Sequence, residues 1–500
     1  YYSHHRLQLP TYPWQKERYW LEGTQEEQRD ENLEALHLWE SAVSAGRYQA
    51  QRGPLDLALH TYPAKQQCLE ELTIAYITNA LSNFGAYNQP GEIHYLDNLL
   101  HQFKISSTYR KLLSRWLNKL VSVGFLKQQE EEIFVCDRPL PKPQINSVVN
   151  NAKEFFTDAP FLLDYLQRCG NQLTNILTGK LSPLETLFPG ASLETAENIY
   201  EKWAVARYFN DIARGITEAV VKALPRGKHL RILEIGAGTG GTTTSLLPVL
   251  PPERTTYYFT DISDFFFIRA QQKFKEYSFV HYSLLDIEQN PQDAGYNNQS
   301  FDLIVATNVL HATCNLGKTL KHVQSLLAPG GLLLLNEVTD YASWLEISMA
   351  LIEGWQLFDD PLRQDNPLLS HEQWQEALRD SGFEKVATLP ELGSSAQVLG
   401  QHIIIGQVPV CEAHPEACTT SAVAKPSIVS NTIEEFFTSP IVEQKLEPSL
   451  TFKQFLAAEP QERYEMLESY LSEQVARVLG LSTSKISIEQ PLKEMGFDSL

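Results

Sequence analysis

The chain has 500 residues, of which 43% are hydrophobic and 20% are charged, and its formal net charge is −20 at pH 7. This length exceeds a single hydrophobic core and predicts roughly two to four domains. The acidic balance argues against nucleic acid as a partner of the whole chain. No apolar run reaches the ~18 residues of a membrane helix, so we expect no membrane association. The six scattered cysteines form no C-x-x-C pair, which predicts reduced thiols in a cytoplasmic protein and no metal site.

The first residues, 1–22, are rich in aromatic side chains, proline and basic groups. Within them, residues 9–22 read LPTYPWQKERYWLE. This motif resembles the linker that follows the acyltransferase domain of modular polyketide synthases. The resemblance implies that residues 1–22 are such a linker and lie across neighbouring ketosynthase and acyltransferase domains.

Residues 23–225 are predicted to form a mainly helical lid. Apolar residues recur at helical spacing over residues 112–123, and short strands are expected at 125–127 and 133–135. Helix, helix, hairpin is a winged-helix pattern, which in some proteins reads nucleic acid. The basic residues on or near the second helix are Arg110, Lys111, Arg115 and Lys119. This basic cluster is small for an acidic chain, so we expect a structural cap and no nucleic-acid site.

Residues 226–408 alternate strand-like and helix-length segments, which predicts an α/β domain around a parallel sheet buried on both faces. The predicted strands are 231–235, 256–259, 280–282, 301–305, 332–335 and 403–405. The first strand runs into a glycine loop at 236–241, whose glycines permit a tight turn and a close backbone approach to a ligand. The same spacing also satisfies the dinucleotide-binding pattern G-x-G-x-x-G.

Acidic residues at three successive strand ends favour S-adenosylmethionine over a dinucleotide. We predict that Glu234 lies near the methionine end of this cofactor, that Asp261 accepts hydrogen bonds from the ribose hydroxyls, and that Asp286 lies near the adenine amino group. Either aspartate alone could be an ordinary helix N-cap. The full set of predicted cofactor contacts is Glu234, Gly236, Gly238, Gly240, Asp261, Asp286 and Asn308. Together they predict a class I, Rossmann-like methyltransferase fold with an N-terminal helical lid.

The fourth and fifth predicted strands each lead to a candidate catalytic residue, His311 and Glu337. The carboxyl ends of parallel strands form one crevice, so these side chains could hydrogen-bond. A carboxylate on one imidazole nitrogen fixes the tautomer and raises the basicity of the other nitrogen, which suits removal of a proton from carbon. A buried histidine can instead be a satisfied core residue, but the strand-end position and the acidic partner favour a base.

Several motifs follow one another in order between residues 25 and 408. They include Leu-His-Ala-Thr at 310–313, Pro-Gly-Gly at 329–331 and Glu-Gly-Trp-Gln-Leu-Phe-Asp-Asp at 353–360. Together they resemble the C-methyltransferase domain of polyketide synthases. The resemblance assigns His311 as the catalytic residue and Glu337 as its partner, and it places Tyr208 on a lid helix, either closing over the site or packing. Asn336 departs from the apolar residue expected there.

Residues 409–450 are rich in proline, serine, threonine and alanine without any period, which predicts a flexible linker. Residues 451–500 contain an amphipathic helix and end in Gly-Phe-Asp-Ser-Leu. This ending resembles the attachment site of an acyl carrier protein, with Ser499 carrying 4′-phosphopantetheine. The later helices of such a domain are missing from this sequence, so we expect the carrier fragment not to fold by itself.

The resemblance implies methyl transfer from S-adenosylmethionine to the α-carbon of a β-ketoacyl chain on an acyl carrier protein. His311 would remove the α-proton with help from Glu337. Two alternatives stay open: an O-methyltransferase acting on the same carrier-bound intermediate, and a catalytically silent methyltransferase-like scaffold. The intact Glu234, Asp261 and dyad argue against the scaffold. The linker 409–450 is too short for a reductase domain, so we expect an α-methyl-β-ketoacyl product.

Overall fold

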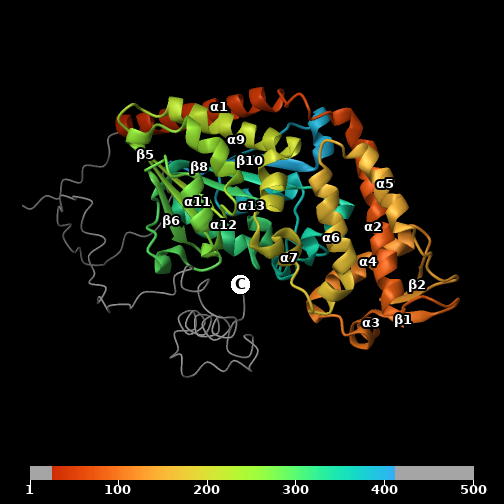
Figure 1. Cartoon of the computed structure of the whole chain (residues 1–500). Coiled ribbons are helices and arrows are strands. Elements are labelled where there is room, and N and C mark those ends of the chain that lie inside the picture. Colours follow the sequence, from red (N-terminus) through yellow and green to blue (C-terminus); the bar gives the residue numbers. More distant parts are fainter. Residues whose placement is uncertain (1–24, 411–500) are drawn as a thin grey trace, which may run out of the picture. The chain divides into compact units, whose positions relative to one another are not determined.

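The computed structural model describes residues 25–410, with side chains from residue 32 onward. This part forms a sheet-centred core and a helical region beside it (Figure 1). The α-helices are α1 (Gln25–Ala50), α2 (Tyr62–Phe84), α3 (Leu96–Phe103), α4 (Arg110–Ser122), α5 (Ile145–Phe155), α6 (Pro160–Leu177), α7 (Leu184–Leu187), α8 (Glu194–Glu197), α9 (Ala204–Ala223), α10 (Gly241–Leu246), α11 (Phe267–Lys273), α12 (Leu316–Leu326) and α13 (His371–Asp380). The strands are β1 (Ile93–Tyr95), β2 (Lys127–Glu130), β3 (Ile133–Val135), β4 (Leu230–Ile235), β5 (Thr255–Asp261), β6 (Val280–Leu284), β7 (Phe301–Thr307), β8 (Leu327–Val338), β9 (Lys385–Leu389) and β10 (Gln401–Gln407).

The central sheet has the strand order β6-β5-β4-β7-β8-β10-β9. The strands from β4 to β8 pair in parallel, which confirms the predicted α/β class. After β6 the chain crosses to the other side of β4, so the carboxyl ends of β4 and β7 frame a ligand crevice.

The last two strands differ from the expected all-parallel sheet. Strand β10 runs antiparallel to both β8 and β9, and β9 was not predicted. The connection between β9 and β10 is too short for a parallel crossover through a full helix, which leaves the antiparallel arrangement. Most β9 side chains are only half-buried, so this edge strand lacks the continuous apolar run that marked the others.

Helices cover both faces of the sheet, because successive strand side chains point to opposite faces. On one face, Ala42 of α1 and Ile216 of α9 share a hydrophobic cluster with Ile232 of β4. On the other face, Leu320 of α12 packs in a cluster with Leu233, the next residue of β4. Both clusters are fully buried, so the sheet is the centre of the core.

The predicted boundary between lid and core at residue 225 needs correction. Helices α1 and α9 precede it in sequence but pack on the sheet. The segment after β8 follows it but contributes Ile347 and Leu351 to the hydrophobic cluster of the helical region. The hydrophobic clusters of the sheet and of the helical region therefore do not correspond to two consecutive parts of the sequence. Each cluster contains a segment from the other side of residue 225.

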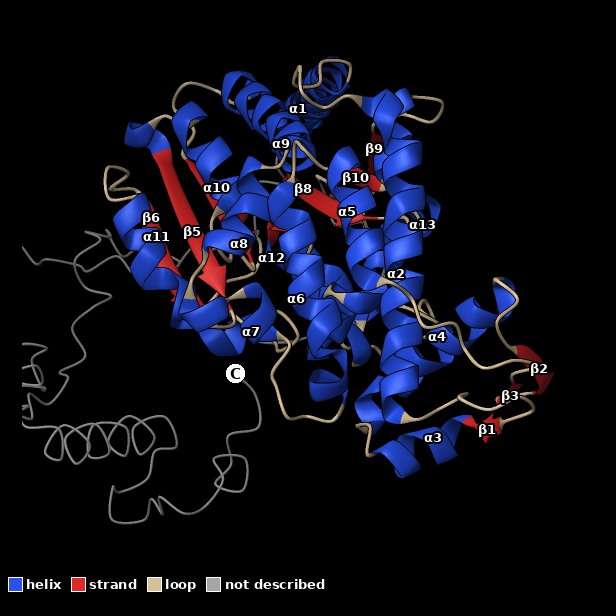
Figure 2. Ribbon diagram, turned by 45° about the vertical axis from the view of Figure 1, so that its right-hand side comes forward, coloured by secondary structure: helices blue, strands red, loops and turns tan. Residues whose placement is uncertain are grey.

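The helical region is built around α2, α4, α5 and α6, and Figure 2 shows α2 and α6 running alongside each other. Leu72 of α2, Trp116 of α4 and Leu166 of α6 lie in its cluster. The segment after β8 is anchored there by hydrogen bonds, among them Trp116 Nε1 to the Glu346 carbonyl at 3.3 Å. This segment therefore connects the lid to the edge of the sheet at which the parallel strands end.

The predicted winged-helix pattern is present. Helices α3 and α4 pack beside a three-stranded antiparallel sheet, β1-β3-β2. The basic residues on α4 all have internal partners: Arg110 contacts Asp97 and Glu132, Lys111 lies over the ring of Phe358, Arg115 pairs with Glu346, and Lys119 pairs with Glu70. These charges hold the region together, which supports the prediction of a structural cap.

Three further features concern residues 25–410 only. None of their helices is long and apolar enough to span a membrane. No cluster of His, Cys, Asp and Glu side chains in this range could hold a metal ion. The thiols of Cys68, Cys136, Cys169 and Cys314 are free, and the first three are buried.

Candidate active site

The glycine loop joins β4 to α10. Gly236, Gly238 and Gly240 have φ angles of 62°, 53° and 72°, a region that other residues rarely adopt. An ideal Cβ on Gly236 would lie 2.4 Å from the Val309 side chain, whereas one on Gly238 would meet nothing closer than 3.9 Å. Gly236 is therefore required by packing, and Gly238 leaves the loop backbone open to a ligand.

This loop borders a cavity of about 220 Å³, called the loop cavity below. Residues from the core and from the lid line it, including Gly236, Gly238, Thr242, Asn308, Phe188 and Tyr200. The lid therefore closes the crevice at the carboxyl ends of β4 and β7 from the opposite side.

Glu234 lines the loop cavity, as expected of a cofactor-binding acid, and is 2% exposed. Its Oε2 accepts hydrogen bonds from the Thr243 hydroxyl at 2.5 Å and the Tyr257 hydroxyl at 2.7 Å. Burial raises the pKa of Glu234 to about 7, and the two hydroxyls oppose that rise. Contact with the methionine end of a cofactor stays a prediction.

Of the two predicted aspartates, Asp261 contacts the glycine loop and Asp286 contacts the segment after β6. Asp261 accepts hydrogen bonds from the backbone N–H of Gly238 at 2.9 Å and of Ser263 at 3.0 Å, so it ties the loop to the end of β5. Burial raises its pKa. Asp286 accepts the backbone N–H of Glu288 at 3.0 Å, and neither aspartate is among the described residues that line the loop cavity. Their ribose and adenine contacts stay predictions.

The predicted hydrogen bond between His311 and Glu337 is confirmed. His311 lies in a short 3₁₀ turn after β7, Glu337 lies on β8, and Nδ1 is 2.6 Å from Oε2. Their side chains are 2% and 0% exposed. The other oxygen of Glu337 accepts the backbone N–H of Leu310 at 3.0 Å and of Val309 at 3.3 Å. The carboxylate is thus held by donors on two sides.

This geometry assigns the tautomer of His311. Because a carboxylate only accepts hydrogen bonds, Nδ1 carries the proton and Nε2 keeps a free lone pair. Nε2 is buried and has no hydrogen-bond partner among the described residues. The edge of Trp355 packs against the imidazole, with ring centroids 4.9 Å apart. The ring is therefore fixed, and its basic nitrogen is free to accept a proton.

His311 lines a second cavity of about 250 Å³, the His311 cavity. Asn336, which departed from the family pattern, also lines it and accepts a hydrogen bond from Gln401 at 2.6 Å. The loop cavity and the His311 cavity share Tyr200, Thr307, Asn308 and Ile352. The two cavities therefore meet at a common wall.

Asn308, a predicted cofactor contact, stands in that wall. It has a positive φ of 51°, its N–H donates to the Asn336 carbonyl at 2.8 Å, and its side-chain oxygen accepts the Val338 N–H at 3.1 Å. These bonds fix the left-handed turn that redirects the chain from β7 toward His311.

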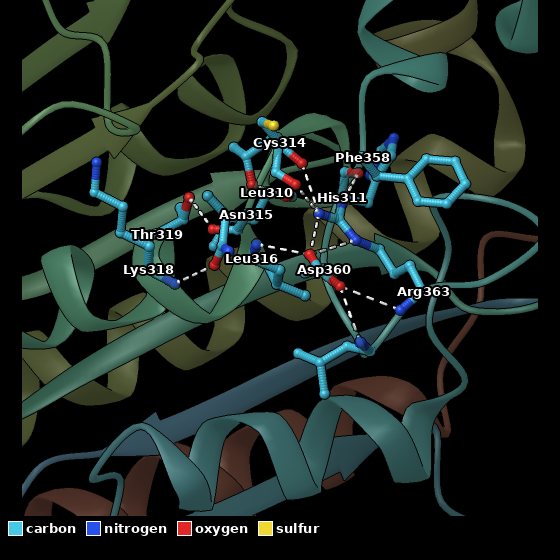
Figure 3. Close-up of polar contacts among 12 residues, drawn as sticks. Leu310, His311, Cys314, Asn315, Leu316, Lys318, Thr319, Phe358, Asp360 and Arg363 are labelled. Carbon is cyan, nitrogen blue, oxygen red and sulfur yellow. Dashed lines mark hydrogen bonds and ion pairs between the residues drawn. The ribbon is translucent and has the colours of Figure 1, made fainter.

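The ion pair between Arg363 and Asp360 stabilises the turn that carries His311 (Figure 3). The guanidinium of Arg363 donates to the carbonyls of His311 and Thr313, both at 2.7 Å. Asp360 accepts from Arg363 Nε at 3.0 Å and from the Leu316 N–H at the start of α12 at 2.9 Å. Arg363 and Asp360 are fully or nearly buried. Asp360, at the end of the 353–360 motif, and Arg363 therefore position the turn that carries His311.

The structure does not bring Tyr208 to the site, which corrects the prediction of a catalytic role. Its hydroxyl donates to the Ala50 carbonyl at 2.7 Å, and it lines a different cavity with α1. Tyr200 lines both site cavities instead. Nearby, Asn210 donates to the Tyr200 carbonyl at 3.1 Å and accepts from Thr242 at 3.0 Å, which ties the lid to α10.

Sequence reasoning missed the roles of three residues that the structure gathers here: Tyr200, Trp355 and Arg363. The motif at 353–360 and the arginine after it marked two of them without indicating a function. Tyr200 had no signal beyond its place in the helical region. The predicted attachment residue Ser499 lies outside the described residues.

Comparisons with known proteins find methyltransferase domains. A family model described as a methyltransferase domain matches residues 233–333. The solved CurJ carbon methyltransferase is 36% identical, with 76% of this chain and 99% of that chain covered and a TM-score of 0.69. The CMeT domain of the citrinin polyketide synthase is 25% identical, with coverages of 76% and 98% and a TM-score of 0.62.

Curated relatives are much longer proteins. Polyketide synthase PksM of Bacillus subtilis (strain 168) is 27% identical over 419 residues, which are 80% of this chain and 9% of that protein. The chain thus spans about a tenth of the length of such relatives.

Proposed function

The chain belongs to the carbon methyltransferases of polyketide synthases, and we propose that it transfers a methyl group from S-adenosylmethionine to the α-carbon of a β-ketoacyl thioester on an acyl carrier protein. One observation carries the proposal. His311, whose Nε2 has no hydrogen-bond partner among the described residues, lines a cavity that shares a wall with the loop cavity. A base and a bound methyl donor would therefore meet across that wall.

The loop cavity suits S-adenosylmethionine. Its backbone is open at Gly238, the buried Glu234 is at hand for a cationic amine, and aromatic side chains close the opposite wall. Bound there, the cofactor would supply an electrophilic methyl group on a sulfonium sulfur. Asp261 already orders the loop through Gly238, so a cofactor would find the loop preorganised.

The dyad supplies the base. The hydrogen on a carbon between a ketone and a thioester is acidic, because two carbonyls share the charge of the enolate. His311 Nε2 would accept that proton, and the electron pair of the C–H bond would form the new bond to the methyl carbon, while the pair of the broken methyl–sulfur bond would return to the sulfur of the leaving S-adenosylhomocysteine. Glu337 stabilises the imidazolium that forms, at 2.6 Å from Nδ1. The residues lining the His311 cavity are buried or half-buried, which limits the access of water to the base.

The proposed partners follow from the flanking motifs. The substrate would arrive on a carrier protein modified with 4′-phosphopantetheine, as the motif at Ser499 indicates for the same chain. The ketosynthase and acyltransferase of the same module would build the β-ketoacyl chain. The product would be an α-methyl-β-ketoacyl thioester, unless a reductase acts on it in trans.

The test uses the full chain with an acetoacetyl thioester of pantetheine and S-adenosylmethionine carrying a ¹³C-labelled methyl group. The proposal expects a labelled methyl bonded to carbon in the NMR spectrum of the product. A labelled methoxy group would instead establish the O-methyltransferase alternative, and no transfer with a bound cofactor would establish the silent scaffold.

The same assay tests the base. His311→Ala should lower the methylation rate by about 10²–10⁴-fold, the usual effect of losing a positioned general base. Cofactor binding by calorimetry should stay nearly unchanged, because the glycine loop is separate from His311. The exposed His281 on β6 offers a matched control, and His281→Ala should methylate normally.

A further inference from the structure

A third cavity, called the outer cavity, adjoins the His311 cavity and has a volume of about 420 Å³. The two share the side chains of Trp203, Val205, Val338, Trp344, Leu345 and Gln401. This common wall is as extensive as the one between the His311 cavity and the loop cavity. The outer cavity is therefore part of the same system of spaces.

The three cavities follow the strand order of the sheet. The loop cavity lies at the ends of β4 and β7, and the His311 cavity lies at the ends of β7 and β8. The outer cavity includes Val338 at the end of β8 and Gln401 at the start of β10, which pair in register. Because β10 is antiparallel, its first residue lies at the same sheet edge. The outer cavity is thus on the opposite side of His311 from the glycine loop.

The outer cavity also reaches the surface. Its lining includes the exposed residues Gln66, Gln67 and Asp340, whereas no residue lining the His311 cavity is exposed. The outer cavity therefore offers a substrate a way from solvent to His311 that a cofactor in the loop cavity would leave open.

The lining of the outer cavity is mainly apolar but includes several hydrogen-bonding groups. Tyr62 is 7% exposed, and its hydroxyl is buried without a hydrogen-bond partner among the described residues. Lys65, 6% exposed, bonds both oxygens of Asp158 at 2.7 and 2.9 Å and lies 5.2 Å from the Tyr62 ring. A buried hydroxyl without a partner is costly, so its presence in a cavity points to a ligand with polar groups.

We propose that the outer cavity binds the pantetheine arm of the carrier-tethered substrate, with the Tyr62 hydroxyl as a hydrogen-bond partner of an arm amide. This inference rests on the proposed function. The arm carries amides that can pair with the Tyr62 hydroxyl, whereas an acyl hydrocarbon tail would leave that hydroxyl without a partner. The thioester then lies in the His311 cavity, with the arm trailing toward solvent.

Two variants of the full chain test this assignment. Ala342→Trp fills the outer cavity, because Ala342 lines it and is half-buried. It should lower kcat/KM for acetoacetyl pantetheine by about tenfold or more. Tyr62→Phe removes only the hydroxyl and should lower the same kcat/KM about three- to tenfold, the effect of one neutral hydrogen bond. The N-acetylcysteamine thioester, which lacks most of the arm, should lose much less with Tyr62→Phe.

A matched control shows whether a loss of kcat/KM comes from filling the outer cavity or from adding a tryptophan side chain at any site. Ala223 lines a distant cavity with Leu38 and Pro329, and Ala223→Trp should leave kcat/KM unchanged. Thermal denaturation of each variant checks that the fold persists. For Tyr62→Phe, no loss of stability is expected, because the hydroxyl has no partner to lose.

A binding measurement makes the inference independent of turnover. Calorimetric titration with pantetheine itself should show binding to the wild-type chain and none to Ala342→Trp. Equal binding and equal kcat/KM in all variants would overturn the inference and leave the methyltransferase assignment intact. A changed preference between short and long β-ketoacyl chains, at a fixed thiol, would also overturn it, because the cavity would then hold the acyl tail.

Discussion

The ends of β4 and β8 each carry a buried glutamate, and the two regions surround that side chain differently. Glu234 accepts hydrogen bonds from two neutral hydroxyls, those of Thr243 and Tyr257. Glu337 accepts from an imidazole and from two backbone N–H groups. Neutral donors leave a buried carboxyl with a pKa raised to about 7, whereas an imidazole partner can take up a proton and share the charge. Burial of an acid therefore does not define its role, and its partners do.

The largest effect on stability should come from the ion pair behind the His311 turn. Arg363→Ala would leave Asp360 and three carbonyls without their donor, a loss of about 3–5 kcal/mol for a broken buried pair. Arg231→Ala is the matched control, because its pair with Asp302 has a 40% exposed arginine side chain and should cost much less. Urea denaturation of the three proteins measures both changes.

A structural role alone would predict only that loss of stability. If Arg363 also positions the base, Arg363→Lys should retain most of the folding free energy but lower kcat, with cofactor affinity unchanged. Equal kcat in wild type and Arg363→Lys would show that the turn needs no such support.

The raised pKa of Glu234 predicts a pH dependence of stability. Folding raises this pKa from 4.5 to about 7, so the folded chain keeps a proton that the unfolded chain has released between these values. The contribution of Glu234 to stability is therefore present below pH 4.5 and is lost as the pH rises through about 7. The loss is on the order of 3 kcal/mol at 1.4 kcal/mol per pKa unit.

Glu234→Gln cannot ionise and keeps an oxygen for both hydroxyls. Its free energy of unfolding should exceed that of the wild-type chain by a margin that grows from about pH 5 to pH 8. Urea titrations of both proteins across this range measure the margin. Parallel pH profiles would show that Glu234 ionises normally in the folded chain.

Substitution of the two glutamates should have different effects on catalysis. Glu337→Gln keeps the shape of the side chain but loses the charge that stabilises the imidazolium. We expect a clear loss of kcat that is smaller than that of His311→Ala, because the basic nitrogen itself remains. Glu234→Gln should act on the KM of the cofactor, since it lines the loop cavity and has no contact with His311.

The dyad should also behave as one unit. Adding Glu337→Gln to His311→Ala should cause little further loss, because the partner has no base left to support. Additive losses in this double-mutant cycle would assign Glu337 a role apart from His311.

The smallest effect should come from Tyr208. Tyr208→Phe removes one hydrogen bond to the Ala50 carbonyl, so stability should fall by about 1 kcal/mol. Methyl transfer should be unchanged, because Tyr208 lines neither site cavity. A large loss of kcat with normal stability would show that Tyr208 does take part in catalysis.

The sequence predicted many of the residues at the edge of the sheet where the parallel strands end. The turn after a buried parallel strand must leave the sheet at its carboxyl end, so the glycine loop, His311 and Glu337 had to gather at one edge. Glu234 and Asp261 were placed by the same logic. Their partners were not, because Thr243 and Tyr257 reach Glu234 only through the packing of α10 and β5.

The walls of the site were hidden for a different reason. Tyr62 and Tyr200 come from the helical region, and Trp355 comes from a segment that leaves the sheet after β8 and enters the lid. The spacing of apolar residues along the chain does not predict that a segment after β8 packs in the lid, since this depends on how the two hydrophobic clusters fit together. The basic residues on α4 illustrate the same limit, because their acidic partners include Glu346, far along the chain.

The sequence by itself determined the parallel core, the glycine loop and the pairing of His311 with Glu337, because strand direction and spacing fix where a strand-end residue must lie. Only the tertiary structure decided which tyrosine reaches the site, that α1 and α9 belong to the sheet, and that three cavities line up along its edge. Those outcomes depend on contacts between residues far apart in the chain, whose energies no local pattern encodes.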